Sequence, residues 1–123
     1  MRSRRVVVTG IGGITALGND WETIRARLLA GRTGVRRMSE WDRFEGVNTR
    51  LAAPVPSFSM PDHWPRKKTR TMGKVAQLSV YAAERALGQA GLIGDSRLTS
   101  GRTGVAYGSS FGSPDSVLGF YEL

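Results

Sequence analysis

RVVVTGIGGITALGND, residues 5–20, joins a basic start, a run of three valines and a cluster of closely spaced glycines. The valines predict a short β-strand, because β-branched residues favour extended backbone. The glycines at 10, 12 and 13 have no side chain beyond hydrogen, so this turn can approach a neighbouring backbone closely. We therefore expect the chain to open with a strand that leads into a close-packed glycine turn.

The first helix is predicted to begin at Asn19 or Asp20 and to end at Gly31. Asn19 and Glu22 have the spacing of a capping box, and glycine is common just after a helix. Three apolar residues fall on one face, which we expect to be buried. They are Trp21, Ile24 and Leu28.

Residues 36–66 show no sustained hydrophobic period. Four prolines interrupt any helix there, because proline lacks the backbone N–H that a helix interior requires. These prolines are Pro54, Pro56, Pro61 and Pro65. We expect short extended pieces that wrap over the domain, in a stretch too long to be an idle connection.

A second helix is predicted over residues 71–90, closed by Gly91. Its apolar stripe is broad and dominated by small residues, which permits close packing against another layer. A short strand at 105–107 should follow and enter a glycine-serine turn, after which Ser113 could cap a helix with Pro114 in its first position. The stripe consists of Val75, Leu78, Ala82, Ala83, Ala86, Leu87 and Ala90. The alternation of strands and helices predicts an α/β layered fold.

Two glycine motifs have lookalikes among enzymes. The first, at 10–15, resembles a dinucleotide-binding turn, but Thr15 replaces its third glycine and the helix begins too late to point its N–H groups at a phosphate. The second, at 108–112, fits the G-x-S-x-G of a nucleophile elbow around Ser110. The chain's single histidine, His63, precedes that serine, whereas the hydrolase order places it after. We disfavour both a nucleotide site and a hydrolytic serine, and interpret His63 as a surface or half-packed loop residue.

Four stretches together carry a family resemblance: residues 5–20, 28–35, 81–87 and 104–112. In this order they resemble the amino-terminal part of the β-ketoacyl-acyl carrier protein synthases, the condensing enzymes of the thiolase-like superfamily. The resemblance implies an α/β fold of alternating helix and sheet layers, α-β-α-β-α when complete. Residues 1–123 would form the incomplete amino-terminal portion of its first domain.

The resemblance also implies a reaction. In this family an acyl group passes to a cysteine, a malonyl carrier thioester is decarboxylated with the help of two histidines, and the carbanion attacks the acyl thioester. The chain contains no cysteine, and those three positions lie further on in the family, so it would hold no catalytic residue. No cofactor and no metal is expected. The implied partners are acyl carrier protein and the acyl and malonyl thioesters, with a homodimer or synthase heterodimer when complete.

Two groups of residues match functional positions of the family. Phe111 corresponds to a residue of the acyl-pocket loop, where a bulky ring would narrow or redirect the pocket, although it could equally be a packing residue. Arg66, Lys67 and Arg70 correspond to carrier-docking residues before Met72. The alternative interpretation of this basic cluster is a solvated helix entrance.

The net charge of +8, from 18 basic and 10 acidic residues, favours acidic partners but does not choose among them. Nucleic acid is disfavoured because no aromatic residues interleave with the basic ones. No stretch is long and apolar enough to span a membrane, and we expect a cytoplasmic protein. Residues 1–123 alone should be poorly stable, because a bare sheet edge and apolar faces would stay exposed.

Two classes of function remain open from the sequence. The chain could belong to a condensing acyltransferase of fatty acid or polyene/polyketide-type biosynthesis. It could instead be a non-catalytic fragment or chain-length-factor-like subunit that only binds acyl carrier protein or a partner synthase.

Overall fold

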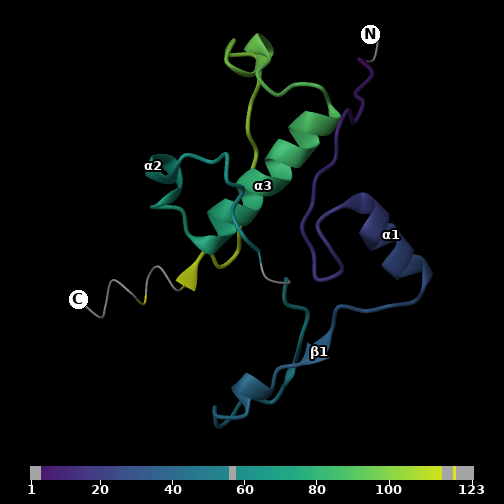
Figure 1. The fold of residues 1–123 in the computed structure, drawn as a ribbon, viewed down its shortest axis with the longest axis vertical. Coiled ribbons are helices and arrows are strands. Elements are labelled where there is room, and N and C mark those ends of the chain that lie inside the picture. Colours follow the sequence, from purple (N-terminus) through teal and green to yellow (C-terminus); the bar gives the residue numbers. More distant parts are fainter. Residues whose placement is uncertain (1–3, 56–57, 115–117, 119–123) are drawn as a thin grey trace. The chain divides into compact units, whose positions relative to one another are not determined.

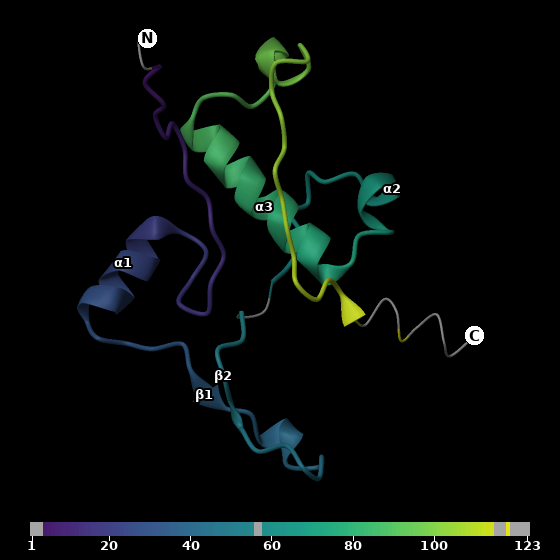
Figure 2. The same ribbon diagram turned by 180° about the vertical axis from the view of Figure 1, so that it is seen from behind.

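The computed structural model describes residues 4–55, 58–114 and 118. The chain forms two compact units. One combines Met1–Gly13 with Met60–Leu123, and the other is Ile14–Ser59. Figures 1 and 2 show the elements of each unit from opposite sides.

The unit at 14–59 contains helix α1, Trp21–Leu29. Its N-cap is Asp20, whose carboxylate accepts a hydrogen bond from the backbone N–H of Thr23 at 2.8 Å. The predicted start at Asn19 or Asp20 is therefore confirmed at Asp20, whereas the capping box of Asn19 and Glu22 is wrong. Two adjacent residues were both capable caps, and the sequence alone does not rank Asn above Asp. The predicted end is confirmed, because Gly31 adopts a φ of +63° directly after the helix.

The face of α1 that carries Trp21, Ile24 and Leu28 is not buried in this structure. Trp21 is 66% exposed and Leu28 54% exposed, while Ile24 is half-buried. The prediction of a buried face is thus wrong for the described residues. Burial needs a second layer, and hydrophobic periodicity alone does not supply one.

The same unit contains a small antiparallel sheet of β1, Arg36–Arg37, and β2, Leu51–Ala52. These strands confirm the short extended pieces expected between residues 36 and 66. Between them lies the 3₁₀ helix η1, Ser39–Trp41, preceded by the buried Met38. The carboxylate of Asp42 lies 2.8 Å from the Arg37 guanidinium and 3.5 Å from that of Arg50. It therefore links the end of β1 to the residue just before β2.

The other unit is built around the long helix α3, Lys74–Gln89, which confirms the predicted second helix with slightly later and earlier ends. Gly91 follows with a φ of +66°. Its N–H is donated to the carbonyl of Gly88, and the N–H of Leu92 to that of Leu87, the pairing of a glycine-terminated helix. The short helix α2, Arg66–Thr69, precedes α3 and was not predicted as a separate element.

The glycine turn packs directly on α3. A Cβ atom at Gly10 would overlap the backbone carbonyl of Ala86, and one at Gly12 would overlap that of Ala82. The backbone N–H of Ile11 is donated to the side-chain oxygen of Gln89 at 2.6 Å, which holds the turn in place. The expected close approach of this turn to a neighbouring backbone is confirmed. It also explains the small residues of α3, because Ala82, Ala86 and Ala90 share the contacted face.

The strands predicted at 5–8 and 105–107 do not form ladders. Figures 1 and 2 draw both segments as unpaired chain, and Val6 and Val105 are 93% and 92% exposed. Among residues 4–55, 58–114 and 118, hydrogen-bonded strands occur in the sheet of β1 and β2 alone. A strand requires a partner that accepts and donates its backbone hydrogen bonds, and neither segment provides one for the other.

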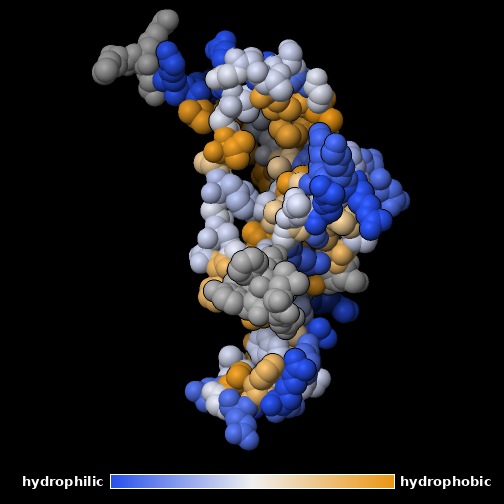
Figure 3. Space-filling view, turned by 90° about the vertical axis from the view of Figure 1, so that its left-hand side faces the viewer, coloured by the Kyte–Doolittle hydropathy of each residue, from blue (hydrophilic) through white to orange (hydrophobic). Residues whose placement is uncertain are grey.

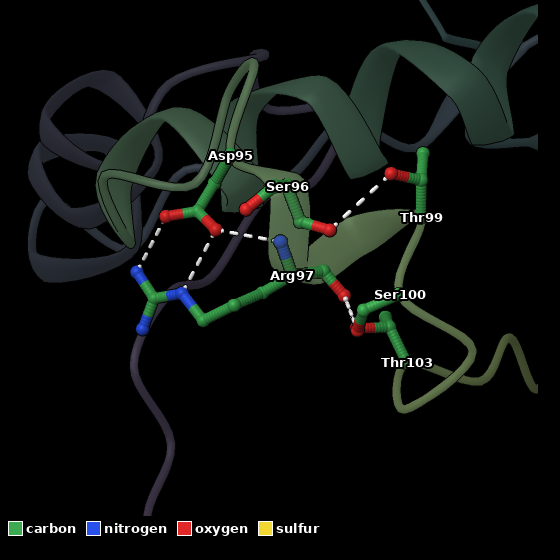
Figure 4. A network of polar contacts seen from close by, with 6 residues as sticks. All are labelled: Asp95, Ser96, Arg97, Thr99, Ser100 and Thr103. Atoms are coloured by element: carbon green, nitrogen blue, oxygen red, sulfur yellow. Dashed lines mark hydrogen bonds and ion pairs between the residues drawn. The ribbon is translucent and has the colours of Figure 1, made fainter.

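The 3₁₀ helix η2, Ser96–Leu98, connects α3 to the second of these segments (Figure 4). The Asp95 carboxylate accepts hydrogen bonds from the side chain and the backbone N–H of Arg97, which lower the pKa of Asp95 from 3.8 to about 2. The pair therefore stabilises this turn fully above pH 3.8, and its contribution is lost as the pH falls through about 2. The carbonyl of Arg97 also accepts hydrogen bonds from Ser100 and Thr103.

The glycine contact predicts that Gly12→Ala destabilises the full-length protein by about 1–3 kcal/mol, because the methyl group must displace the α3 backbone. Gly13→Ala is the matched control, since a Cβ there meets nothing within 4 Å. Chemical denaturation of both variants measures the difference. Equal stability of the two would contradict the packing described here.

Candidate functional site

The basic segment lies on and just after α2. Its side chains are exposed, and Arg66, Lys67 and Arg70 all lie on this short stretch. Lys68 adds a fourth positive charge within five residues. Figure 3 faces the side on which Figure 1 draws α2 and shows a dense group of hydrophilic side chains there. The structure thus brings the three predicted carrier-docking residues together on one exposed segment.

Backbone contacts hold α2 in its helical turn. The carbonyl of Pro65 accepts hydrogen bonds from the N–H groups of Lys68 and Thr69, at 2.8 and 3.2 Å. Thr69 is buried, with 6% of its surface exposed, and its hydroxyl lies 3.4 Å from the carbonyls of Pro65 and Arg66. One side of this segment is therefore anchored by a buried threonine while its basic residues face solvent.

The loop that leads into α2 is attached to α3 through Glu84. One carboxylate oxygen of Glu84 lies 2.5 Å from His63 Nε2, and the other accepts a hydrogen bond from Trp64 Nε1 at 2.9 Å. The hydrogen bond from His63 is the main cause that lowers the pKa of Glu84, and that from Trp64 adds to it. His63 is thus a surface loop residue, as predicted, with its side chain engaged by α3.

An apolar groove lies along a different flank of α3. It has a volume of about 520 Å³, and α3 forms one wall while the segment after η2 forms the other. Almost all of its surface is carbon, so it offers van der Waals contact and few hydrogen bonds. Its lining residues are Val75, Ala76, Ser79, Val80, Ala83, Val105, Tyr107, Ser109 and Ser113.

Phe111 lies on the turn that follows the groove wall. Gly112 adopts a φ of +69° and donates its N–H to the Ser109 hydroxyl at 3.0 Å, which closes the turn. The Phe111 ring is 86% exposed and does not line the groove, although Ser109 two residues before it does. The structure therefore places the predicted acyl-pocket residue on an exposed turn, between Ser109 and Ser113, which do line the groove.

Ser113 connects that turn to the start of α3. Its hydroxyl accepts a hydrogen bond from the backbone N–H of Val75 at 3.0 Å. The N-cap of α3 is Gly73, which has no side chain to satisfy the free N–H groups of the first turn. Ser113 thus caps α3 from 38 residues away in the sequence. The sequence predicts it as the cap of a different helix, one that has Pro114 in its first position. Most of the helix predicted from Pro114 onward lies outside the described residues.

Sequence reasoning missed both long-range contacts, Glu84 with His63 and Trp64, and Ser113 with Val75. Neither has a local signature, because the partners are separated by 20 residues or more. The described residues include no group of three or more His, Cys, Asp or Glu side chains that could hold a metal ion. In the part of the chain that the structure describes, no helix is long and apolar enough to cross a membrane.

Comparison with known proteins gives one consistent match. The family model for the Beta-ketoacyl synthase, N-terminal domain, matches residues 3–121. The 3-oxoacyl-[acyl-carrier-protein] synthase 2 of Staphylococcus aureus strain N315 is 34% identical over 90% of this chain and 26% of its own length. That of Vibrio harveyi is 33% identical over 95% of this chain and 28% of its own.

A solved structure also matches. The crystal structure of a Beta-ketoacyl synthase from Burkholderia phymatum STM815 superimposes with a TM-score of 0.87 and 55% sequence identity. It is matched over 98% of this chain and 30% of its own. This chain therefore spans about a quarter to a third of the length of these proteins.

The capping contact predicts that Ser113→Ala lowers the stability of the full-length protein by about 0.5–2 kcal/mol, the usual effect of removing a side-chain cap. The exposed Ser110 provides the control, and Ser110→Ala should change stability by less than about 0.5 kcal/mol. Thermal unfolding measures both. Loss of stability in Ser110→Ala alone would contradict the assignment of the cap.

Proposed function

Since the chain belongs to the β-ketoacyl synthase family, as part of its N-terminal domain, we propose that the full-length protein is a 3-oxoacyl-[acyl-carrier-protein] synthase. The same matches confirm the α/β, thiolase-like fold class for this amino-terminal part. The proposed reaction is the decarboxylative condensation of a malonyl carrier thioester with an acyl thioester, in fatty acid or polyene/polyketide-type biosynthesis. Condensing activity of the full-length protein on these two thioesters tests the proposal.

The catalytic cysteine and histidines of this proposal are assigned to residues beyond this chain. The chain itself contains no cysteine, and it spans only 26% of the Staphylococcus aureus relative. What these residues would contribute is recognition and shaping of the substrate. A homodimer or synthase heterodimer and a cytoplasmic location remain predictions.

The exposed basic segment is the observation that best supports a carrier partner. Arg66, Lys67 and Arg70 are presented on α2 and its end with their side chains in solvent. Exposed charges steer an acidic partner and each contribute little to its affinity, which suits a carrier that must dock and leave in every cycle. We assign these three residues to the docking of acyl carrier protein.

Phe111 is proposed to shape the acyl pocket. It lies on the turn between Ser109 and Ser113, two residues that line the apolar groove along α3, and its ring is accessible to a ligand or a further layer of protein. An apolar ring of this size would restrict the volume open to an acyl chain. A packing role in the full-length protein is the alternative.

A second candidate is a non-catalytic subunit that binds acyl carrier protein or a partner synthase. It shares the basic segment and the groove, so these features do not separate the two. The intact mass of the protein from its native host, together with its condensing activity, does. A mass near 13.4 kDa without activity would favour the non-catalytic candidate.

Carrier docking predicts that the triple variant Arg66→Glu, Lys67→Glu and Arg70→Glu weakens binding of acyl carrier protein roughly tenfold, since three exposed charges at about 0.5 kcal/mol each sum to about 1.5 kcal/mol. The affinity of the unmodified protein should also fall as salt is raised. The matched control reverses three exposed charges elsewhere, Arg25→Glu, Arg32→Glu and Arg102→Glu. Equal weakening by both triples, or an affinity independent of salt, would refute specific docking at α2.

Pocket shaping predicts that Phe111→Ala shifts the products of the full-length synthase toward longer or bulkier acyl chains, because truncation of the ring enlarges the pocket. The chain-length profile of the products measures this. An unchanged profile in a stable variant would assign Phe111 to packing alone.

A further inference from the structure

Glu84 makes the connection between the long helix and the basic segment. It lies in the middle of α3, and its side chain is one-third exposed. Its two carboxylate oxygens are used by different partners, His63 Nε2 at 2.5 Å and Trp64 Nε1 at 2.9 Å. Both partners are consecutive residues of the loop that ends at α2. We refer to Glu84, His63 and Trp64 as the clasp.

The chemistry of the clasp determines which of its groups donate hydrogen bonds and which accept them. An ionised carboxylate only accepts hydrogen bonds, and an indole nitrogen only donates. His63 must therefore carry a proton on Nε2 to make its contact. The lowered pKa of Glu84 is consistent with this, because both donors favour its charged form. The two rings meet edge to face, with centroids 6.5 Å apart and an interplanar angle of 82°, so a single carboxylate can serve both.

The clasp is adjacent to α2 in the chain. Trp64 donates its backbone N–H to the carbonyl of Pro61 at 3.0 Å, which forms a turn around His63. The next residue, Pro65, is the N-cap of α2 and accepts its first backbone hydrogen bonds. A helix of four residues is too short to persist by itself, because it lies below the length at which helix propagation compensates nucleation. Its start must therefore be held by something outside it.

We propose that Glu84 is a positioning residue for carrier docking: by holding His63 and Trp64 it fixes the start of α2, and hence the arrangement of Arg66, Lys67 and Arg70 that meets the acidic carrier. This inference rests on the proposed docking function. Glu84 itself does not touch the carrier or the reacting atoms. Its effect is to keep a short basic helix ordered before the partner arrives, which removes an ordering cost from binding.

The direction in which carrier binding changes when Glu84 is neutralised separates a positioning role from a purely electrostatic one. Glu84 is a negative charge close to a segment that attracts an acidic protein. If only charge mattered, its neutralisation would strengthen carrier binding. Positioning predicts the opposite, because the loss of the clasp disorders the segment despite the gain in net positive charge.

The experiment uses the full-length synthase and two substrates with the same acyl group, one carried by acyl carrier protein and one by pantetheine. Glu84→Ala should raise the KM for the carrier substrate about five- to tenfold, with kcat and the KM for the pantetheine substrate unchanged. Trp64→Phe, which keeps an aromatic ring and removes the N–H, should raise the carrier KM two- to threefold. Glu84→Gln should recover part of the loss, since its amide oxygen still accepts from Trp64.

The control is Glu45→Gln, which removes one negative charge at an exposed residue of the other unit and should leave both KM values unchanged. An unchanged or lowered carrier KM in Glu84→Ala would overturn the inference. So would an equal rise of KM for both substrates, which would indicate a general structural defect. Intact binding in Trp64→Phe together with no recovery in Glu84→Gln would overturn it as well.

The charge-reversed triple on α2 separates this inference from the function on which it rests. If the triple weakens carrier binding and Glu84→Ala does not, the positioning inference alone fails. If the triple leaves the carrier KM unchanged, docking at α2 fails, and the positioning inference fails with it.

Discussion

The close approach of the glycine turn to α3 is the contact on which the unit of Met1–Gly13 and Met60–Leu123 depends. Gly10 and Gly12 place their backbone where any side chain would overlap the carbonyls of Ala86 and Ala82. Such proximity requires glycine on one side and small residues on the other, and both are present. Because α3 is fixed against the start of the chain in this way, its other faces can be used for different purposes. One carries the apolar groove, and Glu84 presents the attachment point for the loop before α2.

The two ends of α3 are completed by different means, and this difference attaches a distant turn to the helix. At its carboxyl end, Gly91 satisfies the helix locally with a φ of +66°. At its amino end, Gly73 provides no cap, and the N–H of Val75 is satisfied by Ser113. The turn that carries Phe111 is thereby attached to the end of α3 that follows the basic segment. The two proposed recognition elements are separated in sequence by about 40 residues, but both are anchored to the same helix.

Local signals were sufficient to predict part of this structure. The periodic stripe and Gly91 predicted α3, and the glycine spacing predicted a close-packed turn, because each depends on residues within a few positions of one another. The strands at 5–8 and 105–107 were predicted from composition, but a strand forms only with a partner, and that is decided by the rest of the fold. The contacts of Glu84 and Ser113 span 20 to 38 residues and involve residue types that are common on any surface. No pattern in one sequence distinguishes such contacts from chance.

The described residues expose both apolar and charged side chains, and the two kinds have different physical requirements. Large apolar side chains are exposed among the described residues, and Val6, Val105 and Phe111 are 93%, 92% and 86% exposed. Figure 3 shows apolar side chains on the surface near hydrophilic ones, and apolar side chains gain free energy when a further layer removes them from water. The basic segment is different, because its charged side chains gain nothing from burial and remain suited to solvent. A short helix of this kind must be positioned by a polar contact that survives in water, and a charged carboxylate with two donors provides one.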